Sequence, residues 1–115
     1  MPKIQAESLS PKEVLINFAD AMANKYKVNK KPFITTLDCE SGFKNIQSRV
    51  LKKGGPNERE DSWGIAQINL PSHPSITRAQ ALDPYWSIEW AAQKFKINPR
   101  IWTCARRLGY ATVNE

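Results

Sequence analysis

Three prolines that each follow a helix-capping residue constrain the fold of this chain most strongly. They occur in Ser10-Pro11, Asp83-Pro84 and Asn98-Pro99. Proline suits a first helical position because its φ is already helical and it lacks an N–H that a helix start leaves unpaired. Glu13 completes a capping box with Ser10, so a helix should begin at Pro11. The apolar stripe of that helix consists of Leu15, Phe18, Ala19, Met22 and Tyr26.

Further start and stop signals predict the other helices. Residues 29–32 open a second helix that ends at 40–42, and Thr77 with Gln80 forms a capping box for a short one. The helix after Asp83-Pro84 should bury Ile88, Ala91, Ala92 and Phe95. The helix after Asn98-Pro99 should bury Ile101, Trp102, Ala105 and Leu108, with Gly109 as its stop. We therefore expect a mainly helical protein with five or six helices around one core.

The segment 43–62 has no helical period, and its only aliphatic residues are Ile46, Val50 and Leu51. Gly54-Gly55-Pro56-Asn57 is typical of a turn. We expect a short irregular hairpin or a long loop that forms one wall of a cleft. Its acidic residues Glu58 and Glu60 are explained by charge balance against Arg49, Lys52 and Lys53.

Length and charge limit the functional classes. A chain of 115 residues predicts one domain, residues 1–115, and we expect a monomer. The net charge of +6 suits a polyanionic partner, which is a cell-wall polymer, a nucleic acid or an acidic membrane surface. The basic residues are dispersed and no basic helix is interleaved with aromatic residues, so we expect no nucleic acid partner. No apolar run is long enough to cross a bilayer, which predicts no membrane insertion.

The first residues, MPKIQAESLSPKE, lack the charged and then apolar pattern of a secretory signal. This predicts a mature fragment, an expression product or a protein released by cell lysis. Cys39 and Cys104 are too few for a disulfide scaffold and lack metal-ligand spacing, so we expect no metal and no cofactor. Two states remain open for these cysteines: a single bridge between packed helices, or two buried thiols.

Glu40 is the strongest candidate for a catalytic residue. It follows Phe33 and Leu37 at helical spacing, so all three should lie on one inward face, with Gly42 as the helix stop. Apolar neighbours and the negative end of the helix dipole both disfavour its charge, which predicts a raised pKa for Glu40. A carboxyl group that stays protonated can donate a proton to a leaving oxygen, as glycoside cleavage requires.

The segment SWGIAQIN, residues 62–69, is the second candidate for the site. Its small residues let a ligand approach the backbone, while Gln67 is a polar side chain in an apolar run and needs a partner. That partner is Glu40, the backbone, or a sugar. Ser62 and Asn69 are further candidates for substrate binding. Trp63 is the first tryptophan that we would test for stacking on sugar, whereas Trp86, Trp90 and Trp102 are expected in the core.

ESGF followed about twenty residues later by SWGIAQIN resembles the lysozyme-like superfamily, in particular the lytic transglycosylase (SLT) domain and the goose-type and hen-type lysozymes. The likeness covers roughly residues 33–108. It implies a lysozyme-like α+β fold in which Glu40 is the catalytic acid and the G-I-A-Q-I segment lines a sugar cleft. The chain lacks the A-Y-N-A-G motif of SLT domains and has a long charged loop after Glu40, so the subfamily stays open.

The activity implied by this resemblance is cleavage of the β-1,4 bond between N-acetylmuramic acid and N-acetylglucosamine in peptidoglycan, at the cell wall. In the transglycosylase variant the 6-hydroxyl of the muramic acid closes an anhydro ring, and no second enzyme carboxylate is needed. In the hydrolase variant a second carboxylate acts, for which Asp61 is the candidate. Asp61 lies one residue further from the motif glycine than in hen-type lysozymes, which in an extended segment turns it to the other face. The sequence therefore favours the transglycosylase.

Two other functional classes compete with this interpretation. One is a wall-binding module that keeps the cleft without turnover, and the other is a small basic helical protein that binds nucleic acid. A catalytic role for His73, the lone histidine, is disfavoured because the sequence offers no partner for it.

Overall fold

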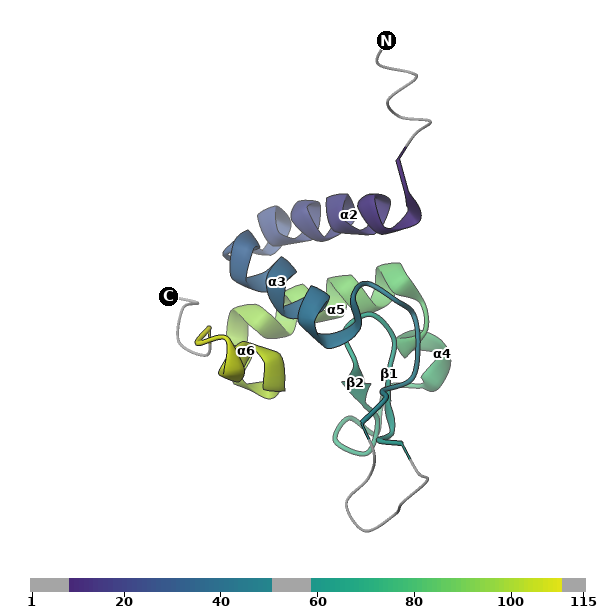
Figure 1. The fold of residues 1–115 in the computed structure, drawn as a ribbon. Coiled ribbons are helices and arrows are strands. Elements are labelled where there is room, and N and C mark those ends of the chain that lie inside the picture. Colours follow the sequence, from purple (N-terminus) through teal and green to yellow (C-terminus); the bar gives the residue numbers. More distant parts are fainter. Residues whose placement is uncertain (1–8, 51–58, 111–115) are drawn as a thin grey trace.

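The computed structural model describes residues 9–50 and 59–110. Within these ranges the chain forms five α-helices, one short 3-10 helix and a small two-stranded sheet (Figure 1). Helices α2 (Pro11–Tyr26) and α5 (Pro84–Ile97) lie in adjacent layers. The sheet lies below them in the view of Figure 1. The prediction of a mainly helical fold is confirmed.

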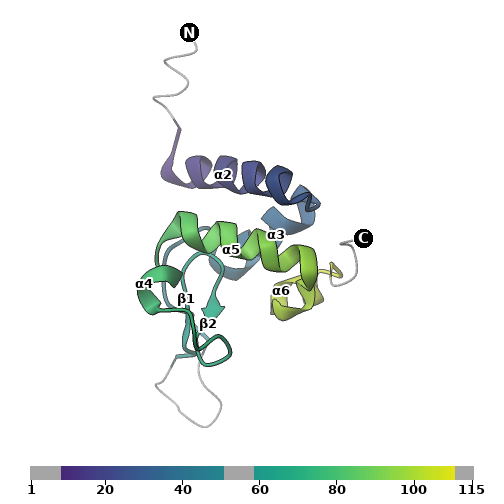
Figure 2. The same cartoon turned by 180° about the vertical axis from the view of Figure 1, so that it is seen from behind.

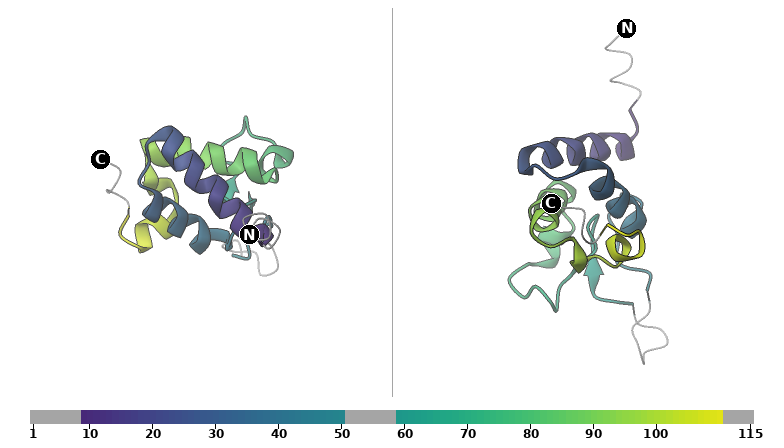
Figure 3. Two further views of the ribbon diagram at one scale, coloured as in Figure 1. Left: turned by 90° about the horizontal axis from the view of Figure 1, so that it is seen from above. Right: turned by 90° about the vertical axis from the view of Figure 1, so that its left-hand side faces the viewer.

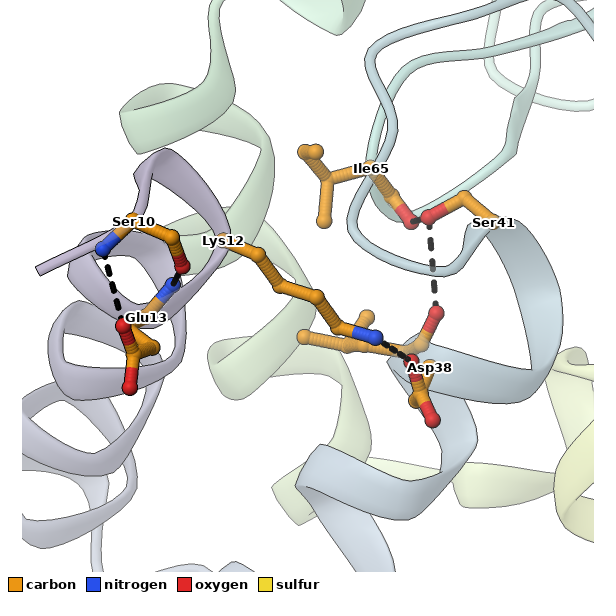
Figure 4. A network of polar contacts seen from close by, with 7 residues as sticks. Ser10, Lys12, Glu13, Asp38, Ser41 and Ile65 are labelled. Atoms are coloured by element: carbon orange, nitrogen blue, oxygen red, sulfur yellow. Dashed lines mark hydrogen bonds and ion pairs between the residues drawn. The ribbon is translucent and has the colours of Figure 1, made fainter.

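Helix α2 (Pro11–Tyr26) begins at the predicted residue because the capping box is present. The Ser10 hydroxyl accepts a hydrogen bond from the Glu13 N–H (3.1 Å), and the Glu13 carboxylate accepts one from the Ser10 N–H (2.8 Å; Figure 4). Ala19 is fully buried, and the other members of the predicted stripe are partly buried against the core.

Helix α3 (Lys30–Ser41) ends where Gly42 adopts a left-handed backbone conformation, φ 65°, and donates its N–H to the Asp38 carbonyl. Phe33 and Leu37 are buried on its inner face. Asp38 lies on the outer face, where its carboxylate pairs with Lys12 of α2 at 3.0 Å (Figure 4). The predicted helix, its stop and its inward face are confirmed.

Strands β1 (Ser62–Trp63) and β2 (Ile68–Asn69) form an antiparallel hairpin in which Ser62 is paired with Asn69. The preceding segment, residues 46–50, contacts β1 through an isolated antiparallel bridge between Gln47 and Trp63. For residues 43–62 a short irregular hairpin or a long loop was expected, and hydrogen bonds pair residues 48–50 with residues 60–62 in antiparallel register. The predicted turn Gly54-Gly55-Pro56-Asn57 lies outside the described residues.

Helices α4 (Arg78–Ala81) and α5 (Pro84–Ile97) begin at the predicted caps, Thr77 with Gln80 and Asp83. The predicted inner face of α5 is buried, and α5 packs along α2, as Figures 2 and 3 show. Phe95 of α5 contacts Phe33 of α3 edge to face, with ring centroids 5.5 Å apart. The core thus lies between α2, α3 and α5 and continues to the hairpin turn.

The last helix differs from the prediction. A 3-10 turn, η1 (Pro99–Ile101), is followed by a separate five-residue helix, α6 (Thr103–Arg107). Trp102 between them has an extended backbone, φ −101° and ψ 126°, which resets the helical register. Trp102 and Ala105 are buried, but Ile101 and Leu108 are 42% and 43% exposed. The prediction that one helix buries all four side chains was therefore wrong.

Burial of the Trp102 indole explains this break. Its Nε1 donates to the Ala66 carbonyl at 2.8 Å, and its ring packs against Phe95 and Trp90. A buried indole N–H needs a partner, and the Ala66 carbonyl in the hairpin turn supplies it. Trp86 and Trp90 are partly buried and pack against the core.

Gly64 lies where the hairpin packs against the backbone of α4. Its φ is 83°, and a Cβ at this position would lie 1.8 Å from the Ala81 carbonyl oxygen. We expect Gly64→Ala to lower the free energy of unfolding by more than ~3 kcal/mol, because backbone must move. Gly109 has a similar φ of 81° with no atom near its Cβ position, so Gly109→Ala should cost only ~1 kcal/mol. Urea titration of both variants measures the difference; equal losses would contradict the packing of Gly64 against α4.

Candidate functional site

Glu40 lies in the last turn of α3 and is partly buried. One carboxylate oxygen, Oε2, accepts a hydrogen bond from the Cys104 backbone N–H at 3.0 Å. That N–H belongs to the first turn of α6, where backbone donors have no partner within the helix. Glu40 therefore joins the end of one helix to the start of another.

The pKa of Glu40 is raised above its usual value, as predicted. Burial is the main cause, because it disfavours the charged form. The Cys104 N–H opposes the shift by stabilising the carboxylate. The negative charge of Glu60 raises the pKa of Glu40 further, while Arg106 and Arg107 lower it. Glu40 is thus a carboxyl group that holds its proton to higher pH than a free glutamate.

A disulfide between Cys39 and Cys104 fixes the two helix ends beside Glu40. The Cα atoms are 6.0 Å apart, and the bridge closes a sequence separation of 65 residues. Of the two states left open by the sequence, the structure has the bridge. Because Cys39 precedes Glu40 directly and Cys104 donates to it, the bridge holds donor and acceptor together.

Glu40 lines an open cleft of about 720 Å³, one side of which is formed by residues of the segment 60–72. The end of α3 and residues 46–50 form two sides of it, and residues 101–107 form another. Of the residues predicted for the site, Glu40, Ser62, Gln67 and Asn69 line this cleft. Asp61 and Trp63 are not among its lining residues.

The strand register explains why Asp61 is absent from the cleft and Glu60 is present. Hydrogen bonds from Glu60 N to Val50 O and from Ser48 N to Ser62 O pair the two segments in antiparallel register. Alternate residues of a strand face opposite sides. Glu60 and Ser62 therefore face the cleft, and the intervening Asp61 faces away.

Glu60 is the carboxylate that the sequence interpretation missed. Charge balance against Arg49 was expected, but the ion pairs formed by residues 9–50 and 59–110 do not include Glu60. Its side chain is 3.5 Å from the Ser48 hydroxyl. Glu58, Lys52 and Lys53 lie outside the described residues. A sequence signal for Glu60 existed, because the alternation that turns Asp61 away from the cleft places Glu60, two residues before Ser62, on the same face as Ser62.

On the other face of the hairpin, Asp61 and Trp63 contact each other. The Trp63 indole N–H donates to the Asp61 carboxylate at 2.5 Å. The Arg78 guanidinium lies 4.5 Å from the centroid of the Trp63 ring. These contacts account for both side chains without a ligand, and they stabilise the hairpin against the start of α4.

Of the partners expected for the Gln67 side chain, which were Glu40, the backbone and a sugar, the structure has the backbone. Its side-chain amide donates to the carbonyls of Ile46 and Gly64, both at 2.9 Å. Asn69 donates to the Ser62 hydroxyl at 3.2 Å and accepts from Ser72. These polar side chains therefore hold the cleft wall together, and their free edges face the cavity.

The turn inside SWGIAQIN is the point where the helices meet the hairpin. The Ser41 hydroxyl of α3 donates to the Ile65 carbonyl at 2.7 Å (Figure 4). The Ser87 hydroxyl of α5 accepts from the Ala66 N–H, and Trp102 donates to the Ala66 carbonyl. Buried backbone groups need such partners. The motif thus positions Glu40 by fixing the end of α3.

His73 lies away from the cleft and contacts the edge of Trp90, with ring centroids 5.1 Å apart. Burial and the nearby Lys94 lower the pKa of His73. This packing agrees with a structural rather than a catalytic residue. None of the helices in the described part of the chain combines the length and apolarity needed to cross a membrane.

Comparisons with protein-family models, with curated proteins and with solved structures found no match.

The raised pKa of Glu40 makes the free energy of unfolding depend on pH. The folded state holds the Glu40 proton more tightly than the unfolded state, so stability falls as pH rises through the interval between the two pKa values. We expect Glu40→Gln to be more stable than the wild type at pH 7, and the gain to vanish well below the usual pKa of a glutamate. Chemical unfolding at a series of pH values measures this.

Glu89 is a control for which the change in stability should have the opposite sign, because its pKa is lowered. Hydrogen bonds from Lys25 and Tyr26 lower the pKa of Glu89. Glu89→Gln should therefore lose stability at pH 7, and this loss should fade in acid as the wild-type carboxylate is protonated. A Glu40→Gln variant that behaves like Glu89→Gln would contradict the burial of Glu40.

Proposed function

We propose that this chain adopts the lysozyme-like α+β fold and cleaves peptidoglycan at the β-1,4 bond between N-acetylmuramic acid and N-acetylglucosamine. The observation that carries the proposal is the partly buried Glu40 carboxyl, which lines the cleft with a raised pKa. A carboxyl group of this kind suits the general acid of a glycosidase. The resemblance of ESGF and SWGIAQIN to lysozyme-like proteins supports the choice of substrate.

In this mechanism Glu40 donates its proton to the glycosidic oxygen as the bond to C1 of the muramic acid breaks. The Cys104 N–H then stabilises the carboxylate that Glu40 becomes. Glu40 next accepts the proton of the attacking hydroxyl group and returns to its starting state. The proton is therefore conserved over the cycle, and no cofactor takes part.

We propose the lytic transglycosylase route, in which the attacking group is the 6-hydroxyl of the same muramic acid. This step forms the 1,6-anhydro sugar and needs no second enzyme carboxylate. Support comes from Asp61, the second carboxylate that the resemblance to hen-type lysozymes suggested. Its contact with Trp63 lies on the face of the hairpin opposite to the cleft.

A two-carboxylate hydrolase is the second candidate, because Glu60 lines the cleft with Glu40. The two carboxyl groups interact electrostatically, since Glu60 raises the pKa of Glu40. In a hydrolase Glu60 would activate water or stabilise the developing cation. The products separate the routes, because hydrolysis gives a reducing-end sugar heavier than the anhydro sugar by one water.

The direct test is Glu40→Gln, which removes the transferable proton and keeps the shape of the side chain. We expect turnover on cell-wall suspensions to fall at least ~10²-fold, the low end for loss of a general acid. Asp38→Asn is the matched control, because Asp38 lies on the same helix and faces outward to Lys12. It should keep wild-type turnover.

Clearing of wall suspensions at the wild-type rate by Glu40→Gln would remove Glu40 as the acid. A wild type that binds walls without cleaving them would support the wall-binding module instead. Strongly salt-dependent binding to DNA without any wall cleavage would support the nucleic-acid binder. Mass spectrometry of the digest should find 1,6-anhydro-N-acetylmuramic acid ends if the transglycosylase route is correct.

A further inference from the structure

Three basic side chains from different parts of the chain line the same cleft as Glu40. Lys44 follows the end of α3, Arg49 lies on the segment paired with Glu60, and Arg107 lies in the last turn of α6. Their convergence arises from the fold, because they are far apart in the sequence. Three separate segments of the cleft wall thus each carry one cationic group.

The described structure does not neutralise these charges. Its ion pairs use Lys12, Lys25 and Lys30, and none of them includes Lys44, Arg49 or Arg107. Among the described residues, two carboxyl groups line the cleft, Glu40 and Glu60. When Glu40 is protonated, three positive side chains face one negative side chain there. An anionic ligand would therefore improve the charge balance of this cleft.

Arg107 is the best placed of the three. It lies on α6, one helical turn after Cys104, whose N–H contacts Glu40, and it lines the same cleft. Its neighbour Arg106 is occupied by hydrogen bonds to the Arg100 carbonyl and the Thr103 hydroxyl. No hydrogen bond within the described residues engages the Arg107 guanidinium, and this residue is exposed. Guanidinium groups bind carboxylates through two parallel hydrogen bonds.

We propose that the cleft selects glycans that carry carboxylates on their sugars, and that Arg107 is the principal specificity determinant, assisted by Lys44 and Arg49. This inference rests on the proposed function and defines its substrate more closely. A neutral chitin-type glycan offers these side chains no charged partner. The muramic acid of peptidoglycan offers a carboxylate in two places, on its lactyl group when that is free and on its peptide when one is attached.

The test measures binding to the inactive Glu40→Gln protein by titration calorimetry. The ligands are a neutral N-acetylglucosamine oligomer, a peptide-free glycan with free lactyl carboxylates, and a glycan that carries peptides. We expect at least one anionic glycan to bind roughly tenfold more tightly than the neutral oligomer, as for one charge-assisted hydrogen bond. The anionic ligand with the larger advantage identifies which carboxylate is recognised.

Arg107→Gln in the same background should lose most of this advantage while binding the neutral oligomer as before. Arg100→Gln is the matched control, because Arg100 is exposed on η1 and does not line the cleft. It should leave all three affinities unchanged. Equal binding of neutral and anionic glycans, or equal effects of the two substitutions, overturns the inference. Equal effects would indicate only a general attraction between a basic protein and an anion, which salt screens.

Failure of the inference and failure of the proposed function give different results. If the wild type cleaves cell walls but Arg107→Gln does not alter selectivity, the inference alone is wrong. If the protein prefers anionic glycans through Arg107 but does not cleave them, the inference stands and the catalytic proposal is wrong.

Discussion

The link between Cys39 and Cys104 is the constraint on which the candidate site depends. Helix α6 has only five residues, and a helix of that length is not stable on its own in water. The bridge ties it to the end of α3 across 65 residues, worth about 4 kcal/mol in the chain-entropy account. It also places the Cys104 N–H on Glu40 and brings Arg107 to the cleft. Disulfides of this kind persist in oxidising surroundings.

The hairpin turn inside SWGIAQIN supplies the second half of the site. Ser41 and Trp102 donate hydrogen bonds to the carbonyls of residues 65–66, and the Ser87 hydroxyl accepts one from the Ala66 N–H. Gly64 allows this turn to approach α4 at a distance that no side chain permits. The motif thus acts through packing and backbone contacts, and it holds the end of α3 where Glu40 lines the cleft.

Local signals predicted much of the fold. The caps at Ser10, Thr77 and Asp83 act within four residues, so their helices begin where the sequence indicates. The inward direction of Glu40 follows from helical spacing to Phe33 and Leu37 in the same way. The raised pKa of Glu40 followed from that placement.

Features that depend on distant contacts could not be read from the sequence. The break at Trp102 depends on a carbonyl 36 residues away in the chain, so the expected continuous helix was wrong. Residues 60–62 are extended because they pair with residues 48–50, so the place of Glu60 in the cleft was missed. The basic side chains of the cleft looked dispersed because three separate segments contribute them.

The pH dependence of wall cleavage tests most directly whether a protonated Glu40 drives the reaction. Glu60, Arg106 and Arg107 all act on its pKa, and the effect of Glu60 is upward. We expect the rate to fall as pH rises through the raised pKa of Glu40, and this limb to move to lower pH in Glu60→Gln. Asp61→Asn, one residue away on the opposite face, should leave the limb in place. A rate that is constant or rises across that interval, or a limb that moves in Asp61→Asn but not in Glu60→Gln, would contradict the assignment of Glu40 as the acid.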